Sequence, residues 1–156
     1  MEDGFKLELN AEEQKYLLGV ARLAVVKGVS GKFDEKALPP PPGDILKEEL
    51  GAFVTLKKHG SLRGCIGRIV GDAPLYLTVA RMAQAAAFHD TRFSPVSVTE
   101  EDSLEYEVSV LGPIEPCLDP ERIIIGRHGL IIRASGRKGD HQGLLLPQVP
   151  VEWGWD

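Results

Sequence analysis

Two strand-like segments that follow one another directly constrain the fold most. Residues 52–56 form an apolar run, residues 62–69 have the composition of a second strand, and His59-Gly60-Ser61 between them has that of a turn. Parallel strands need a crossover of about a dozen residues or more, whereas antiparallel strands need only a tight turn. Because the strands cluster between helices and do not alternate with them one by one, the sequence predicts an α+β fold.

Helices are predicted on both sides of this strand pair. Asn10 and Glu13 have the spacing of a capping box at a helix start, and Lys27-Gly28 is typical of a helix end. A second helix is predicted from Asp72, as its cap, to about Phe88. Both segments repeat apolar residues at helical spacing, so each helix is expected to pack one face on the sheet.

Several shorter segments complete the expected fold. Residues 5–9 alternate and predict a strand or an extended arm, and residues 104–110 alternate as a strand with one exposed face does. The prolines of residues 39–42 favour a polyproline-II connector over a ligand for an SH3-like partner. After Gly112-Pro113, three apolar runs predict a small three-stranded antiparallel sheet. They are residues 123–125, 130–132 and 144–146.

Composition excludes several classes of protein. The chain has 156 residues, a net charge of −5 and only two cysteines, Cys65 and Cys117. A chain of this length buries a core without disulfides or metals, and a net negative charge gives no bulk attraction to nucleic acid. No phosphate-binding loop, dinucleotide-binding turn or zinc-ligand spacing occurs. We therefore expect a reduced, cytoplasmic protein with no metal site, no cofactor and no membrane association.

Residues 62–67, Leu-Arg-Gly-Cys-Ile-Gly, have an unusual composition for a strand. Two glycines in six residues weaken a strand unless something approaches its backbone closely. Strand alternation predicts that Arg63 and Cys65 project from the same face, where a guanidinium would favour the reactive thiolate form of the cysteine. The alternative is structural: Cys65 fills space, and Arg63 forms an ion pair with the acidic strand of residues 104–110.

These six residues and the segments around them resemble the AMMECR domain family, also called AmmeMemoRadiSam system protein A. The resemblance covers about residues 10–156. The matching segments outside the hexapeptide are residues 51–56, 90–96, 107–111, 126–130 and 143–149. Family members usually continue beyond the counterpart of residues 153–156 into a further helix. Any role that needs this helix is in doubt for this chain, and we expect an apolar patch on the larger lobe to be uncovered.

The resemblance implies one domain with two lobes. The larger lobe would hold about residues 1–112 and 151–156 with an antiparallel sheet, and the smaller lobe about residues 113–150. The hexapeptide would face a cleft between the lobes. Members often occur beside Memo-like and radical-SAM proteins, which implies a protein or peptide partner in a shared modification system. The family's activity is not established.

We weigh three functions for the expected cleft. A recognition domain would hold its partner with Arg63 and Gln148, and Gly64 and Gly67 would allow close approach. A thiol-dependent enzyme would use Cys65 as nucleophile, with His128 or Asp90 moving protons. Asp90 and Arg92 would line the cleft or pair with each other in a turn. RNA binding is the weakest alternative, because its basic stretches, residues 57–70 and 121–138, lack interleaved aromatic residues.

Overall fold

The capping box at Asn10 forms as the sequence predicts. Asn10 Oδ1 accepts the amide of Glu13 at 2.9 Å, and the Glu13 carboxylate accepts the amide of Asn10 at 2.9 Å. These two bonds satisfy donors that the first turn of a helix otherwise leaves unpaired. Helix α1, Ala11–Val29, therefore starts at the expected residue and ends one residue beyond Gly28.

The computed structural model describes residues 7–155. The chain divides into two compact units, Met1–Ile114 (the large unit) and Glu115–Asp156 (the small unit). Residues 151–155, which the resemblance assigns to the larger lobe, are grouped with the small unit. The large unit contains α1, β1 (Gly51–Lys58), β2 (Ser61–Arg68), α2 (Leu75–Phe88) and β3 (Leu104–Leu111), with short 3-10 helices at Glu35–Ala37, Asp44–Lys47 and Glu101–Ser103.

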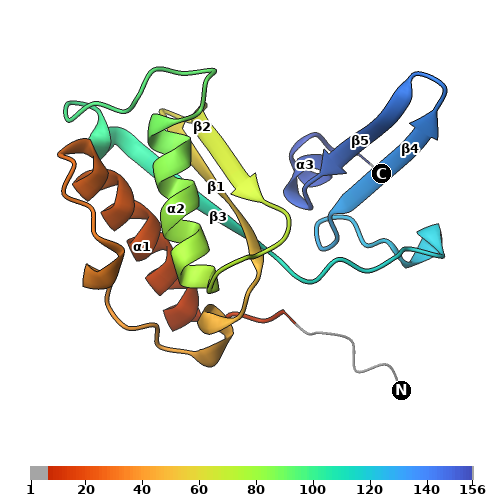
Figure 1. Ribbon diagram of the computed structural model, residues 1–156, viewed down its shortest axis with the longest axis horizontal. Helices are drawn as coiled ribbons and strands as arrows, with labels where there is room; N and C mark the ends of the chain where they lie inside the picture. The colour runs from red at the N-terminus through yellow and green to blue at the C-terminus, as the bar shows by residue number, and fades with distance from the viewer. Residues whose placement is uncertain (1–6, 156) are drawn as a thin grey trace. The chain divides into compact units, whose positions relative to one another are not determined.

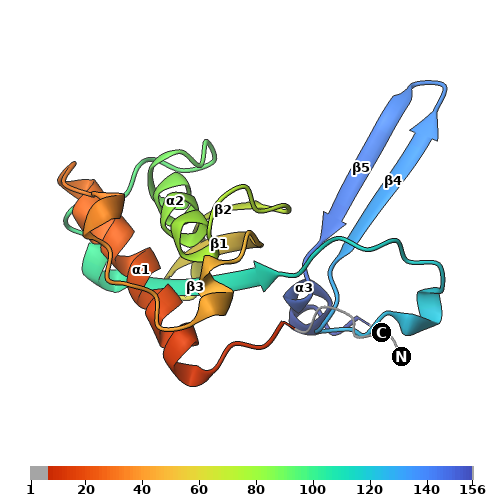
Figure 2. The same ribbon diagram turned by 60° about the horizontal axis from the view of Figure 1, so that its bottom comes forward.

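The large unit has two layers, a sheet and a pair of helices. Its strands are antiparallel in the order β2-β1-β3 (Figure 1). Helices α1 and α2 cover one face of this sheet, as Figure 2 shows from a second side. Ala52, Val54 and Leu56 of the central strand point into this layer and are fully buried. The predicted α+β class and the antiparallel sheet with packed helices are thus confirmed.

The hairpin turn fixes the register of the first two strands. Lys58 pairs with Ser61, which leaves His59 and Gly60 as a two-residue loop. Both loop residues have positive φ angles, 51° and 76°, as a type I′ hairpin turn requires. Near this turn the pairing of β2 is irregular: Leu62 pairs with Lys57 and Gly64 with Leu56. Arg63 between them has no cross-strand partner, which is the pattern of a β-bulge.

The cap predicted for the second helix is wrong. Pro74 occupies the N-cap position of α2 and makes no side-chain cap bond. The amide of Leu75 donates to the Glu48 carbonyl at 2.9 Å, so a backbone acceptor from another segment takes the place of a side-chain cap. Asp72 forms an ion pair with Arg68 of β2. The prediction failed because this acceptor is distant in sequence.

The small unit contains a two-stranded sheet, so the predicted three-stranded sheet is wrong. Strands β4, Leu130–Gly136, and β5, Gly139–Leu145, form an antiparallel hairpin, and α3, Gln148–Glu152, follows. The first of the three apolar runs, residues 123–125, follows the 3-10 helix Pro120–Arg122 and leads into a turn. The Ile124 carbonyl accepts the amides of both Arg127 and His128, which closes this turn and leaves the run unavailable for strand pairing.

The remaining expectations concern the N-terminal segment and the prolines. The strand or arm predicted for residues 5–9 lies partly outside the described residues, and residues 7–9 are not in a strand. Leu7 and Leu9 pack against the core. The proline segment connects two 3-10 helices, and the hydroxyl of Tyr16 in α1 donates to the Pro39 carbonyl at 2.6 Å. This bond ties the connector to the helix.

Candidate functional site

Cys65 lies in the middle of β2, an outer strand of the sheet. Its backbone amide donates to Oδ2 of Asp90 at 2.9 Å, and its carbonyl accepts from Nη2 of Arg92 at 3.3 Å. Both partners belong to the turn that follows α2. Their side chains bond the edge of β2 at this point as a neighbouring strand would, so they protect an otherwise exposed strand edge.

Asp90 and Arg92 also bind each other. Arg92 Nε donates to Asp90 Oδ1 at 3.0 Å and Arg92 Nη2 donates to Asp90 Oδ2 at 2.7 Å. The Asp90 side chain is only 3% exposed, whereas that of Arg92 is 56% exposed. Hydrogen bonds from Arg92, and then from the Cys65 amide, hold the pKa of Asp90 well below its usual range against the effect of burial. A buried carboxylate therefore fixes a guanidinium that is half open to solvent.

Arg63 has different partners from Cys65. Its Nε donates to Glu100 Oε1 at 2.7 Å, and its Nη2 donates to the Ser94 carbonyl at 2.8 Å. The side chain is only 12% exposed, and its Nη1 atom is buried with no hydrogen-bond partner among the described residues. Arg63 therefore forms an ion pair, as the structural alternative expects. Its acid, Glu100, lies before β3 and not in the acidic strand itself.

Glu100 is the anchor of this second cluster. Its carboxylate accepts the amide and the hydroxyl of Ser97, at 3.1 and 3.0 Å, and also lies 3.6 Å from Lys58 Nζ. The bond from Arg63, followed by those from Ser97, lowers the pKa of Glu100 to about 2 although burial acts in the opposite direction. The charged cluster holds the segment after α2 against β2.

Phe93 links the two arginines. The Arg63 guanidinium carbon lies 5.9 Å from the centre of its ring, and that of Arg92 lies 5.5 Å from it. Both distances are in the range of cation–π attraction. Arg63 and Arg92 are thus joined through an aromatic ring, whereas the side chains of Arg63 and Cys65 bond to different partners.

The thiol of Cys65 is on the face of the sheet away from the helices. Cys65 pairs with Thr55 across the strands, and its Sγ lies 3.2 Å from Thr55 Oγ1. The thiol is partly exposed. It also interacts electrostatically with Arg92, whose pKa is raised mainly by Asp90 and to a smaller extent by Cys65. A hydroxyl therefore lies beside this sulfur, and a fixed guanidinium bonds the backbone of the same residue.

The glycines beside Cys65 serve packing within the large unit. A Cβ atom on Gly64 would lie 2.2 Å from the Ala86 carbonyl oxygen, so β2 and α2 approach more closely than a side chain permits. A Cβ atom on Gly67 would lie 2.2 Å from the ring of Phe53. The unusual composition of the hexapeptide thus has a structural cause at both glycines.

His128 and Gln148 lie in the small unit. His128 Nδ1 accepts the amide of Ile124 at 3.0 Å, which gives the histidine a role in the turn before β4. Gln148 begins α3. Their predicted roles as proton carrier and binding residue stay predictions, as does the inter-lobe cleft.

Three residues of the site were not predicted from the sequence: Thr55, Phe93 and Glu100. The position of Thr55 could have been predicted, because the predicted hairpin pairs the two strands and brings Thr55 opposite Cys65. Phe93 lies within a matched segment but has no feature that distinguishes it from a core residue. Glu100 is one acid among the eight of residues 99–121, and sequence spacing does not select it.

Within residues 7–155, no group of three or more histidine, cysteine, aspartate or glutamate side chains could hold a metal ion. None of the described helices is long and apolar enough to cross a membrane.

The fold and the charged turn around Cys65 define an α+β protein with a protected outer strand in its larger unit. Residues 18–156 match the model of the AMMECR1 family. The chain therefore belongs to the AMMECR1 family, which confirms the resemblance.

Similar proteins are found in archaea. A protein of Thermococcus onnurineus is 44% identical over 154 residues, which cover 91% of this chain and 72% of the relative. A protein of Methanothermobacter thermautotrophicus is 41% identical, over 95% of this chain and 78% of the relative. The crystal structure of uncharacterised protein PH0010 from Pyrococcus horikoshii is similar with a TM-score of 0.80 and 37% identity, over 96% of this chain and 76% of that one.

Proposed function

We propose that this protein is an accessory recognition domain that binds a partner protein or a substrate at the surface around Arg63, Cys65 and Arg92. The Memo-like and radical-SAM proteins implied by the family resemblance are the proposed partners, in a shared modification system. The observation that supports this proposal most is the Asp90–Arg92 pair. It fixes a half-exposed guanidinium at the backbone of Cys65.

A fixed arginine is suited to recognition. Asp90 and the Cys65 carbonyl occupy Nε and Nη2 of Arg92, so its Nη1 group is the donor that a carboxylate or phosphate would meet, and less side-chain entropy is lost on binding when the guanidinium is already held. Asp90 and Phe93 both contact the Arg92 guanidinium, so its position is set before a ligand arrives. Arg63 acts differently: bonded to Glu100 and only 12% exposed, it positions the segment that contains Arg92. The proposed ligand group is therefore an anion bound by Arg92.

Capture of the two proposed partners tests this function. The chain is immobilised, and Memo-like and radical-SAM proteins from the same genome are passed over it. We expect Arg92→Gln to lose capture and Arg81→Gln to keep it, because Arg81 pairs with Glu35 on the outer side of α2. Equal capture by both variants would contradict the proposal, provided that both have the same unfolding midpoint.

A second candidate is a thiol-dependent enzyme with Cys65 as nucleophile. It is favoured by the Thr55 hydroxyl at 3.2 Å from the sulfur, which can hydrogen-bond to it. Alkylation by iodoacetamide between pH 6 and 9 tests it, with Cys117→Ser and Cys65→Ser variants reporting on one thiol each. Cys65 should react faster than exposed Cys117 at pH 6 if it is a nucleophile. Slower reaction of Cys65 across the whole range would count against this candidate.

A further inference from the structure

The other outer strand of the sheet is β3. Strand β3 is eight residues long, and within residues 7–155 it pairs only with β1. On its other side such a strand presents backbone amides and carbonyls that can pair with another chain. At β2 the equivalent edge is bonded by Asp90 and Arg92. The two edges of the sheet therefore differ.

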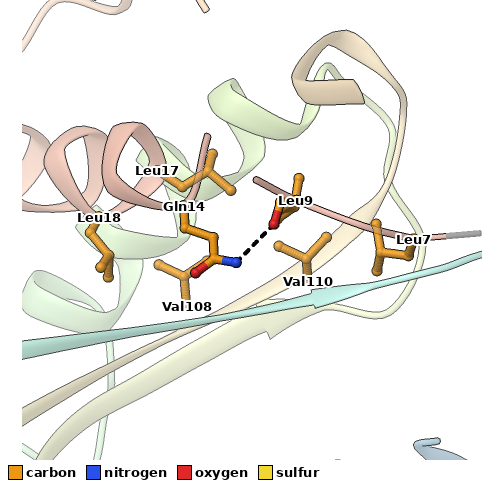
Figure 3. A pocket seen from close by; sticks show the side chains of 7 residues that line it. All are labelled: Leu7, Leu9, Gln14, Leu17, Leu18, Val108 and Val110. Carbon is orange, nitrogen blue, oxygen red and sulfur yellow. Dashed lines mark hydrogen bonds between the residues drawn. The ribbon is translucent and has the colours of Figure 1, made fainter. Parts of the chain in front are cut away.

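An apolar groove lies next to the outer edge of β3. It has a volume of about 380 Å³ and lies among the N-terminal segment, α1 and β3 (Figure 3). Its lining residues are Leu7, Leu9, Gln14, Leu17, Leu18, Val108 and Val110. Gln14 Nε2 donates to the Leu9 carbonyl at 2.8 Å, which fixes the N-terminal segment as one wall.

The direction in which the groove opens follows from burial. Val108 and Val110 pair with Val54 and Ala52 of β1, and both partners are 0% exposed, so the groove is closed on that side. Leu18 on α1 is 41% exposed. The groove is therefore closed toward β1 and open beside Leu18.

We propose that β3 binds an extended peptide segment of a partner protein as a fourth strand of this sheet. Side chains alternate across a strand, so every second side chain of the added segment would enter the groove beside Val108 and Val110. Main-chain bonds to β3 would supply affinity, and the groove would select apolar residues at alternate positions.

The charge of β3 indicates which residues should lie between the apolar residues of the added segment. The opposite face of β3 contains Glu105 and Glu107, both exposed, and residues 99–121 contain eight acids and no lysine or arginine. Lys57 already pairs with Glu107 at 2.7 Å, which shows that this face accepts a cation from a neighbouring strand. The added segment is therefore expected to alternate apolar residues with lysine or arginine.

The same acids argue against a second copy of this chain as the partner. Antiparallel pairing of β3 with β3 would bring the Glu105 and Glu107 side chains of both copies onto one face. Like charges on neighbouring strands are destabilising. A cationic segment of another protein matches this edge, whereas β3 itself does not.

A fluorescent octapeptide that alternates valine and lysine tests the proposal on the whole chain. We expect it to bind at least tenfold more tightly than a peptide of the same composition with all valines before all lysines. N-methylation at every valine blocks one edge of the peptide, and N-methylation at every lysine blocks the other. One of these two peptides should lose at least tenfold in affinity and the other should bind nearly as the parent peptide does.

Variants of the chain test whether the peptide binds at the groove beside β3. Leu18→Asn and Glu105→Gln should each weaken binding several-fold, whereas Val98→Asn, an exposed valine outside the groove, should not. Equal binding of the alternating and the block peptide would overturn the proposal, as would equal loss from both methylated peptides. A dimer of the chain that the peptide does not dissociate would also overturn it, because a second copy would then occupy the edge.

Discussion

The amide of Cys65 donates a 2.9 Å hydrogen bond to the buried carboxylate of Asp90, 25 residues further along the chain. This bond joins the outer strand β2 to the turn after α2 and orients the carboxylate that holds Arg92. The thiol, the guanidinium and the strand edge are thereby placed by a single side chain, and this makes Asp90 the residue on which the site depends.

Replacement of Asp90 by alanine should destabilise the protein by about 1–3 kcal/mol, because it leaves the Cys65 amide without its acceptor and removes the partner of Arg92. Asp90→Asn keeps an acceptor for the amide and should cost less. Urea unfolding at pH 7 measures both. Asp44→Ala is the matched control: the Asp44 side chain is 96% exposed, and its loss should change stability by less than about 0.5 kcal/mol. A loss for Asp90→Ala as small as that of the control would refute the anchoring role.

The lowered pKa of Glu100 predicts a pH dependence of stability. Its pKa is about 2 in the folded protein and its ordinary value is 4.5, so the carboxylate stabilises the fold fully above about pH 5. This contribution is lost as the pH falls toward 2. The free energy of unfolding should therefore fall less between pH 5 and 2.5 in Glu100→Gln than in the parent protein, by on the order of 1–2 kcal/mol. Glu105→Gln, on the exposed face of β3, serves as the control and should leave the slope of the parent protein.

Gly64 should tolerate no side chain. Gly64→Ala would place a methyl group 2.2 Å from the Ala86 carbonyl oxygen and should cost about 2–3 kcal/mol, because a backbone atom cannot move aside easily. Gly19 in α1 has no atom within 4 Å of an added Cβ, and Gly19→Ala should stabilise the protein by about 0.5–1 kcal/mol. Thermal unfolding of the two variants compares these effects. A Gly64→Ala protein as stable as the parent would show that β2 and α2 can separate at little cost.

Removal of the Tyr106 hydroxyl in β3 should not destabilise the protein and is expected to stabilise it slightly. The oxygen is buried and has no hydrogen-bond partner among the described residues, and burial raises the pKa of Tyr106 to about 12. Tyr106→Phe removes the desolvation cost and leaves the ring in place, so stability should stay equal or rise by up to about 1 kcal/mol. A loss above about 1 kcal/mol, measured by urea unfolding, would indicate that the hydroxyl has a partner.

Local signals predicted the fold better than distant ones. The capping box at Asn10 and the two-residue turn at His59-Gly60 each depend on residues close in sequence, and both form. The N-cap of α2 failed because the acceptor for the Leu75 amide comes from Glu48. The third strand of the small unit failed because a run of isoleucines has the same composition in a turn and in a strand. Composition alone does not indicate whether a pairing partner is in reach.

In the candidate site, too, contacts between residues close in sequence were predicted and distant ones were not. Asp90 and Arg92, two residues apart, form the pair that the sequence analysis weighed. The expectation that Arg63 and Cys65 act side by side came from regular alternation, and the bulge at Arg63 interrupts it. Glu100 lies 37 residues from Arg63. Only the packing of the segment after α2 against β2 selects it from the other acids of the chain.

The most direct test of the proposed recognition surface is NMR of the isotopically labelled chain titrated with the Memo-like or radical-SAM protein. The account predicts that the chemical shifts of the backbone amides of Cys65 and Arg92 change first and most. It also predicts that Arg92→Gln weakens binding of the partner at least tenfold. Changes confined to residues remote from β2 and the Asp90 turn, with these two amides unaffected at saturation, would contradict it.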